Sequence, residues 1–273
     1  MMKYSVCNEL FGSLSLDESC RIVREAGFSG IEFAPYTVFG DFSSSDIDQG
    51  IAAMRRALDA EGLAFVGFHW LMTKPAGLHL STPDSALRAK SRDHLGRLLE
   101  AAGALGGGVL ILGSPKQRMS LPGQGRAAAT SLLCETLSEL APLASSCSSK
   151  ILIEQLSPDQ TDVVNSMEEA VACVESIGSE AIDGMFDFHN AMSEAEPWQE
   201  LVRKHYAHIG HVHINEIDGR APGTGNSNYR PAYDVLAEKG YDKWVSIEIF
   251  EIPENPASTL RASMKLFETL ERR

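Results

Sequence analysis

The chain has 273 residues, of which 44% are hydrophobic and 22% are charged, an ordinary composition for a globular protein. Its formal net charge of −13 argues against nucleic acid or an anionic membrane surface as a partner, because either would require a basic face. No apolar run in the sequence approaches the roughly 20 residues that span a bilayer.

The N-terminus and the cysteines predict a cytoplasmic protein. Met1–Cys7 contains one lysine and no long apolar core, which is not typical of a signal peptide. The five cysteines form no Cys-x-x-Cys pair, and their number is odd. This pattern is typical of reduced, mostly buried thiols in a cytosolic protein, so we expect the cysteines to be structural.

Short β-rich runs alternate along the whole chain with longer segments that carry apolar residues at helical spacing. The predicted strands are, in order, Tyr4–Asn8, Gly30–Phe33, Ala64–His69, Val109–Leu112, Lys150–Glu154, Ala181–Asp187, Ile209–Ile214 and Trp244–Ile249. The helical spacing is clearest over Ile51–Ala60, Ser85–Ala104 and Ala127–Ala144.

Capping residues mark several helix boundaries. Ser15 is followed three residues later by Glu18, which is the spacing of a capping box and predicts the start of a helix. Gly62 and Gly178 stand where helical patterns stop, as expected for residues that end a helix in the left-handed conformation.

Eight strands that are each followed by a helix indicate a (β/α)8 TIM barrel, a fold of roughly 250 residues. A doubly wound open sheet has the same alternation, but it predicts a glycine-rich turn after the first strand, and the segment at 8–13 is not one. The glycine run Gly106–Gly108 precedes a strand instead of following one. We therefore predict an α/β protein with one barrel domain over residues 1–273, since no linker or composition break indicates a second domain.

Four acidic or imidazole side chains stand at the ends of the last four predicted strands: Glu154, Asp187, His213 and Glu248. They are 33, 26 and 35 residues apart, close to one strand-loop-helix-loop unit per step. Side chains at the carboxyl ends of barrel strands point into the mouth, so we expect these four to converge. Three carboxylates repel one another unless a cation lies between them, and this donor set suits Mn²⁺, Mg²⁺ or Co²⁺. The alternative for any single residue is a helix cap or an ion pair with a lysine.

These residues lie in segments that resemble the xylose-isomerase-like barrel superfamily, and within it the sugar phosphate isomerase/epimerase group that includes ketose 3-epimerases and hydroxypyruvate isomerase. The similar segments are Gly27–Phe33, Ile153–Glu154, Phe186–Asp187, His211–Gly225 and Lys239–Phe250. The resemblance runs over essentially the whole chain. It implies one divalent metal ion, with Mn²⁺ favoured over Mg²⁺, Co²⁺ or Zn²⁺, held by the four strand-end residues.

The resemblance also implies that Glu154 and Glu248 are the catalytic acid–base pair on opposite faces of the substrate. A metal that chelates a ketose carbonyl and its neighbouring hydroxyl acidifies the adjacent C–H. One carboxylate can then remove a proton to give an enediolate, and the other can return one. The implied function is a metal-dependent isomerase or epimerase of a small sugar or hydroxy-carbonyl compound in carbohydrate metabolism.

Three positions that grip the sugar depart from the epimerase pattern. Asn190 stands where the epimerases have a histidine three residues after the Asp ligand, and His189 lies one residue earlier. Gln160 stands in place of a glutamate, and Arg220 follows the His ligand by seven residues instead of six. We expect these four residues, with His69 at the end of the third predicted strand, to bind the substrate, whose identity stays open.

Other residues near the predicted mouth have two interpretations each. Glu32 is either a further mouth carboxylate or a structural hydrogen-bonding group. His211 lies two residues before His213 and faces the same side of the strand, so we expect it one layer deeper in the barrel as a core residue. Trp70 is either an apolar wall for a sugar or plain core. Arg230, on the loop after the seventh predicted strand, is a weak indication of a phosphate site.

Two other functions fit the same pattern. A dehydratase of the 2-keto-inositol or dehydroshikimate type begins with the same proton abstraction and then expels hydroxide. A non-catalytic barrel would use the metal for stability and bind a ligand. In each case we expect a small-molecule partner, a sugar or keto acid, and neither nucleic acid nor membrane. Dimers and tetramers occur in families that the chain resembles, so a homo-oligomer is also open.

Overall fold

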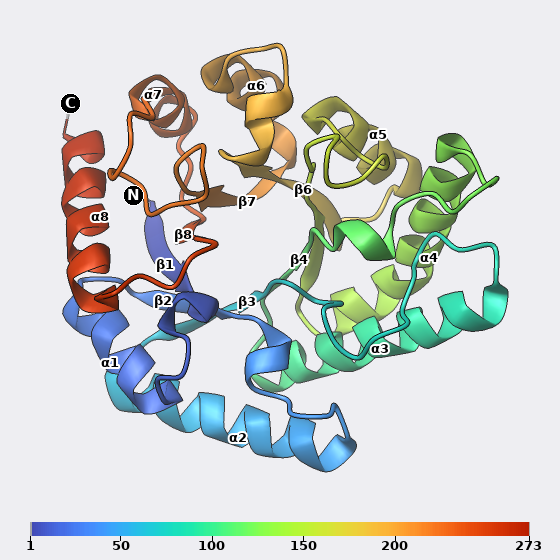
Figure 1. The fold of residues 1–273 in the computed structure, drawn as a ribbon, viewed down its shortest axis with the longest axis horizontal. Helices are drawn as coiled ribbons and strands as arrows, with labels where there is room; N and C mark the ends of the chain where they lie inside the picture. Colours follow the sequence, from blue (N-terminus) through green and yellow to red (C-terminus); the bar gives the residue numbers. More distant parts are fainter. Residues whose placement is uncertain (1, 273) are drawn as a thin grey trace.

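Eight parallel strands close on themselves, and helices surround them, in the computed structural model, which describes residues 2–272 (Figure 1). The strands follow one another around the barrel in sequence order, and the last pairs with the first. The predicted (β/α)8 TIM barrel is therefore confirmed. No helix within residues 2–272 combines the length and the apolar character needed to cross a membrane.

The helices and strands alternate from one end of the chain to the other. The strands are β1 (Lys3–Cys7), β2 (Gly30–Phe33), β3 (Ala64–Phe68), β4 (Val109–Leu112), β5 (Lys150–Ile153), β6 (Ile182–Asp187), β7 (Ile209–Ile214) and β8 (Trp244–Ile247). The helices are α1 (Leu16–Glu25), α2 (Ser44–Glu61), α3 (Ser85–Ala104), α4 (Arg126–Ser146), α5 (Met167–Ile177), α6 (Trp198–His205), α7 (Arg230–Glu238) and α8 (Pro256–Glu271).

The local signals in the sequence act as expected. Ser15 and Glu18 form a complete capping box at the start of α1, which satisfies backbone N–H groups that have no partner within the helix. Gly62 and Gly178 end α2 and α5 with left-handed backbones (φ 64° and 65°), a conformation that costs glycine little.

The strands end slightly earlier than predicted on the side of the mouth. His69, Glu154 and Glu248 each follow the last residue of their strand. Their backbone N–H groups still donate to the preceding strand in the barrel: that of Glu154 to the Leu112 carbonyl and that of Glu248 to the Ile214 carbonyl, each at 3.3 Å. Both carboxylates are thus anchored to the rim of the barrel.

The interior of the barrel is divided into an apolar half and a polar half. Ile111, Leu152 and Met185 pack together inside β4, β5 and β6. The interior beside β1, β2, β7 and β8 instead contains buried polar residues, among them Glu32 and His211. The main hydrophobic core lies outside the strands, between the sheet and the surrounding helices. The polar half is the part of the interior that adjoins the predicted metal ligands.

Candidate active site

The four strand-end residues on β5 to β8 converge. One ligand atom from each of Glu154, Asp187, His213 and Glu248 lies within 4.8 Å of the others, and all four side chains are buried. Asp187 is the last residue of β6, and His213 lies one residue before the end of β7. Adjacent parallel strands bring their carboxyl ends to the same rim, which explains why residues so far apart in sequence meet.

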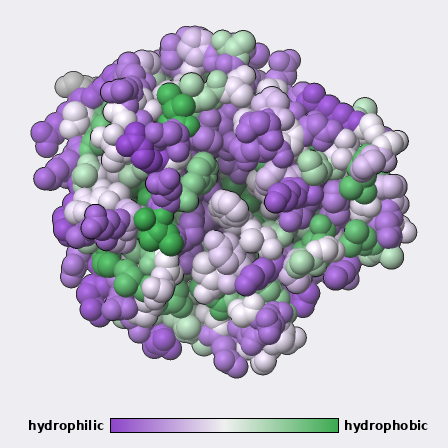
Figure 2. Space-filling model, viewed as in Figure 1, coloured by the Kyte–Doolittle hydropathy of each residue, from purple (hydrophilic) through white to green (hydrophobic). Residues whose placement is uncertain are grey.

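A cavity of about 290 Å³ opens over this cluster. Its wall includes both glutamates of the cluster and three of the predicted substrate residues, together with aromatic and polar loop residues: His69, Trp70, Thr73, Ile111, Gly113, Ser114, Pro115, Lys116, Gln117, Glu154, Leu156, Gln160, Asn190, Glu248 and Phe250. In the space-filling view, which shows the molecule from the same side as Figure 1, the surface is hollowed near its centre (Figure 2).

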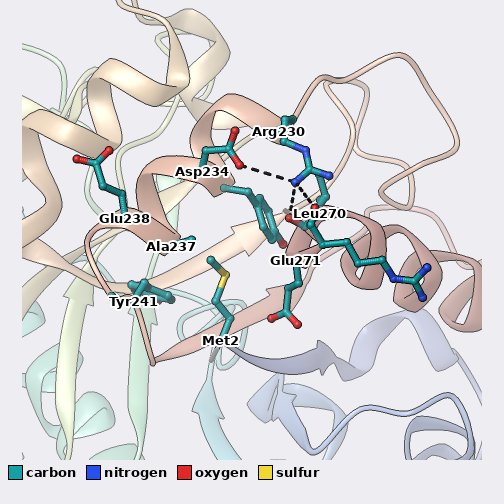
Figure 3. A pocket seen from close by; sticks show the side chains of 11 residues that line it. Met2, Arg230, Asp234, Ala237, Glu238, Tyr241, Leu270 and Glu271 are labelled. Carbon is teal, nitrogen blue, oxygen red and sulfur yellow. Dashed lines mark hydrogen bonds and ion pairs between the residues drawn. The ribbon is translucent and has the colours of Figure 1, made fainter.

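A larger cavity, of about 780 Å³, lies away from the cluster, between α7, the end of α8 and Met2 (Figure 3). Arg230 lines it, and its guanidinium donates to the Leu270 carbonyl at 2.6 Å and lies 3.7 Å from Asp234. This arginine therefore binds the end of α8, and it is not among the described residues that line the cavity over the cluster. None of the four predicted metal ligands lines this cavity, so the smaller one is the better candidate for an active site.

Glu32 is a fully buried carboxylate surrounded by imidazoles. Its Oε1 lies 3.0 Å from Nε2 of His213 and 3.2 Å from Nδ1 of His69. Its Oε2 lies 2.9 Å from Nε2 of His211 and accepts a hydrogen bond from Ser246 at 3.0 Å. Burial alone would raise the pKa of Glu32, but the neighbouring imidazoles hold that pKa well below its usual range. Glu32 is thus an interior anion beneath the mouth, and His211 lies in the barrel core as expected.

The contact with Glu32 orients His213. With Nε2 directed at Glu32, Nδ1 faces the cluster and lies 3.2 Å from Oε2 of Glu248. This nitrogen is buried and has no hydrogen-bond partner in residues 2–272. Burial opposes the charged imidazole, yet the charges of Glu32 and Glu248 raise the pKa of His213 well above its usual value. A cation bound at Nδ1 would replace that proton.

Burial and mutual repulsion also disturb the carboxyl groups of the cluster. Burial, then the charges of Glu248 and Asp187, raise the pKa of Glu154 well above its usual value. Burial and Glu248 likewise raise the pKa of Asp187 to about 6. The pKa of Glu248 is lowered in spite of burial, because His213 stabilises its charge. A divalent cation would offset this repulsion, so the donor set of three carboxylates and one unpartnered imidazole nitrogen fits a metal.

Asn190 and Gln160 form a chain of amides beside the cluster. The backbone N–H of Asn190 donates to Oδ1 of Asp187 at 2.6 Å, and its side-chain Nδ2 donates to Oε1 of Glu154 at 3.0 Å. Gln160 in turn donates to the Asn190 side-chain oxygen at 2.9 Å. These two predicted substrate residues therefore also hold Asp187 and Glu154 in place.

Of the other three predicted substrate residues, one lines the cavity and two do not. His69 lines the cavity, but the wall formed by the described residues does not include His189 or Arg220. Nδ1 of His189 lies 2.6 Å from the Ile217 carbonyl oxygen. The Arg220 guanidinium donates to Asp218 at 2.8 Å and is half-exposed. A role for His189 or Arg220 in binding substrate stays a prediction.

Two residues that contact the predicted site residues carried little or no signal in the sequence. Trp70 donates from its indole Nε1 to Oε1 of Glu248 at 3.0 Å, although the sequence indicated only an apolar wall or core role. Glu9, in the short 3₁₀ helix η1 (Asn8–Phe11), lies 2.6 Å from Nε2 of His69. Its position two residues after the end of β1 gave no periodic or spacing signal. The imidazole of His69 thus bridges Glu9 and Glu32.

The structure is thus that of a TIM-barrel protein with a cluster of three carboxylates and one histidine at the carboxyl ends of its strands. Residues 20–270 match the family model of the xylose isomerase-like TIM barrel. The chain therefore belongs to the xylose isomerase-like TIM barrel family, which confirms the resemblance seen in the sequence.

Several proteins that the chain is similar to are sugar epimerases. The chain is 28% identical over 242 residues to L-ribulose 3-epimerase from Mesorhizobium japonicum, covering 86% of this chain and 75% of the relative. It is 22% identical to fructoselysine 3-epimerase from Escherichia coli O157:H7, covering 94% of each. The crystal structure of 3-keto-D-glucoside 4-epimerase from E. coli superposes with a TM-score of 0.84 at 19% identity, covering 98% of this chain and 100% of that chain.

Proposed function

We propose that this protein is a divalent-metal-dependent sugar epimerase or isomerase that moves a proton on carbon beside a carbonyl group. The observation that carries the proposal is the convergence of Glu154, Asp187, His213 and Glu248 within 4.8 Å beneath a cavity. The sugar epimerases among the relatives support the same class. The substrate would be a small sugar or a related hydroxy-carbonyl compound.

The four converging residues would hold the metal. Mn²⁺ is favoured over Mg²⁺, Co²⁺ or Zn²⁺, because oxygen donors predominate and no thiolate belongs to the set. When bound, such an ion polarises a carbonyl group and acidifies the neighbouring C–H.

Glu154 and Glu248 would carry the proton. Glu154 accepts a hydrogen bond from Asn190 and Glu248 accepts one from Trp70, and these contacts would fix each carboxylate relative to a bound substrate. One carboxylate removes the proton beside the carbonyl to give an enediolate, and the other delivers a proton to the opposite face or to the neighbouring carbon. The stereochemistry of the substrate decides which glutamate is the base.

The test combines metal analysis with deuterium exchange. Purified protein is analysed for metal and incubated in D₂O with a panel of ketoses and keto acids, and incorporation is followed by NMR. We expect about one equivalent of metal per chain and deuterium at the carbon beside the carbonyl. Deuterium exchange should be lost in Glu154→Gln and Glu248→Gln. It should be retained in Glu25→Gln, a control at an exposed residue of α1.

Each other outcome counts against a defined part of the proposal. Exchange at the wild-type rate in both Glu154→Gln and Glu248→Gln contradicts the acid–base assignment. Loss of water from the substrate indicates a dehydratase. Stoichiometric metal with no exchange into any sugar of the panel favours a ligand-binding barrel.

A further inference from the structure

The turn after β4 forms one wall of the candidate active-site cavity. It contains Ser114 and the 3₁₀ helix η3 (Pro115–Gln117), and Ser114, Lys116 and Gln117 all line the cavity. The sequence gave this segment no functional signal. It lines the same cavity as Glu154 and Glu248, so a substrate bound there would contact it.

A buried arginine anchors this turn. Arg118 is fully buried, and its guanidinium donates to the Leu112 carbonyl at 3.1 Å and to the Val164 carbonyl at 3.3 Å. The Gln117 carbonyl accepts a hydrogen bond from the Leu80 N–H at 2.7 Å. Burying a cation is unfavourable unless its partners are well placed, so the turn is held in one conformation by strong constraints.

The turn contains strain and an unsatisfied hydroxyl group. Ser114 has a left-handed backbone (φ 44°), which is unfavourable for any residue other than glycine. Its Oγ is buried and forms no hydrogen bond in the part of the chain that the structure describes. On the loop after β3, Trp70 is also left-handed (φ 51°) and lines the same cavity. Strained backbone conformations cluster at active sites and at segments that hold a ligand, so these two residues support a ligand-binding role for the cavity.

Lys116 supplies positive charge in an otherwise acidic cavity. In residues 2–272 the lysines that form ion pairs are Lys150 and Lys204, so the ammonium group of Lys116 has no carboxylate partner. Lys116 is also the one lysine or arginine among the described residues of the cavity wall. An anionic group beside Lys116 would therefore meet a positive charge that no carboxylate of the described residues neutralises.

We propose that the turn after β4 is a subsite for an anionic group, carboxylate or phosphate, at the end of the substrate remote from its carbonyl. The preferred substrate is then an acidic sugar instead of a neutral one. Lys116 provides the charge, and the Ser114 hydroxyl and the Gln117 amide provide hydrogen bonds. This inference rests on the proposed epimerase or isomerase function and specifies its substrate class.

The test uses three ketoses that differ at one end: D-fructose, D-fructuronate and D-fructose 6-phosphate. Binding to the Mn²⁺-loaded protein is measured by calorimetry, so that the result does not depend on turnover. We expect one acidic probe to bind more tightly than fructose. Lys116→Met should weaken the binding of that acidic probe by about tenfold and leave the affinity for fructose unchanged. Lys116→Arg and the surface control Lys265→Met should keep the preference for the acidic probe.

The comparison of the two acidic probes distinguishes a carboxylate from a phosphate subsite. The inference is overturned if fructose binds as tightly as both acidic probes. It is also overturned if Lys116→Met weakens the binding of all three ketoses equally. Deuterium exchange on the same probes reports separately on the proposed function. Acid-selective binding without exchange into any ketose would leave the subsite standing and count against the epimerase or isomerase assignment.

Discussion

Oε1 of Glu32 lies 3.0 Å from Nε2 of His213, and the other ring nitrogen of that histidine faces the carboxylate cluster. A carboxylate behind a ligating imidazole selects its tautomer and fixes the orientation of its ring. The candidate metal site therefore extends one layer into the barrel, to a residue on β2 that does not line the cavity.

Glu32→Gln should weaken Mn²⁺ binding by about 10- to 100-fold, the usual effect of losing such a supporting carboxylate. Competition with a chelating dye measures the affinity, and circular dichroism checks that the variant is folded. Ser246→Ala is the matched control, because it removes a different hydrogen bond to Glu32 and leaves the His213 contact intact. An unchanged affinity in a folded Glu32→Gln protein would assign Glu32 a purely structural role.

Trp70→Phe should lower kcat for the exchange reaction by about tenfold, since a hydrogen bond to a charged group contributes about 1.5 kcal/mol. The substitution retains an aromatic wall and removes the donor to Glu248. We expect KM to change little, because the lost interaction positions the carboxylate and does not bind the sugar. A raised KM with unchanged kcat would instead show that Trp70 serves only as a wall for the substrate.

Gly113→Ala should damage the site and spare the fold. A methyl group at this position would overlap Oε2 of Glu154, the end of a flexible side chain, so the carboxylate must move. We expect the exchange rate to fall by about 100-fold while the thermal midpoint changes by less than about 3 °C. Gly96→Ala on α3, where the added carbon meets Leu143 at an ordinary 3.4 Å, is the control. Full activity in Gly113→Ala would contradict the need for Glu154 at its present position.

Glu194 should make stability depend on pH. It accepts hydrogen bonds from the Met167 N–H at the start of α5, yet burial, with a contribution from Glu196, raises its pKa to about 7. The folded state thus binds more protons than the unfolded state between about pH 4.5 and 7, so stability falls as pH rises through this window. Urea unfolding at about pH 5 and pH 8 should show a smaller difference in Glu194→Gln than in the parent. Equal differences would mean that Glu194 titrates normally.

The barrel and the cluster were predictable from the sequence because both depend on local pattern and on repetition. Strand-end positions such as Glu154 and Glu248 point to the same rim in any closed barrel with this alternation. The environment around the cluster was not predictable in the same way. Lys116 lies in the cavity wall because buried Arg118 holds its turn, and that contact depends on Val164 from a different loop.

The surroundings of Arg220 were not predictable from the sequence either. The family resemblance implied a substrate contact for it, which stays a prediction, and in the structure its guanidinium donates to Asp218, two residues earlier. The sequence left two roles open for Glu32, a mouth carboxylate or a structural hydrogen-bonding group. Its contacts with His69, His211 and His213 arise only because the barrel closes.

The location of a bound metal tests the central claim most directly. Crystals grown with Mn²⁺ should give one anomalous peak per chain, with oxygen ligands from Glu154, Asp187 and Glu248 and a nitrogen ligand from His213 at about 2.0 to 2.3 Å. The peak should disappear in Asp187→Asn crystals grown in the same way. A peak elsewhere in the chain, or none at this cluster in well-ordered wild-type crystals, would contradict the account.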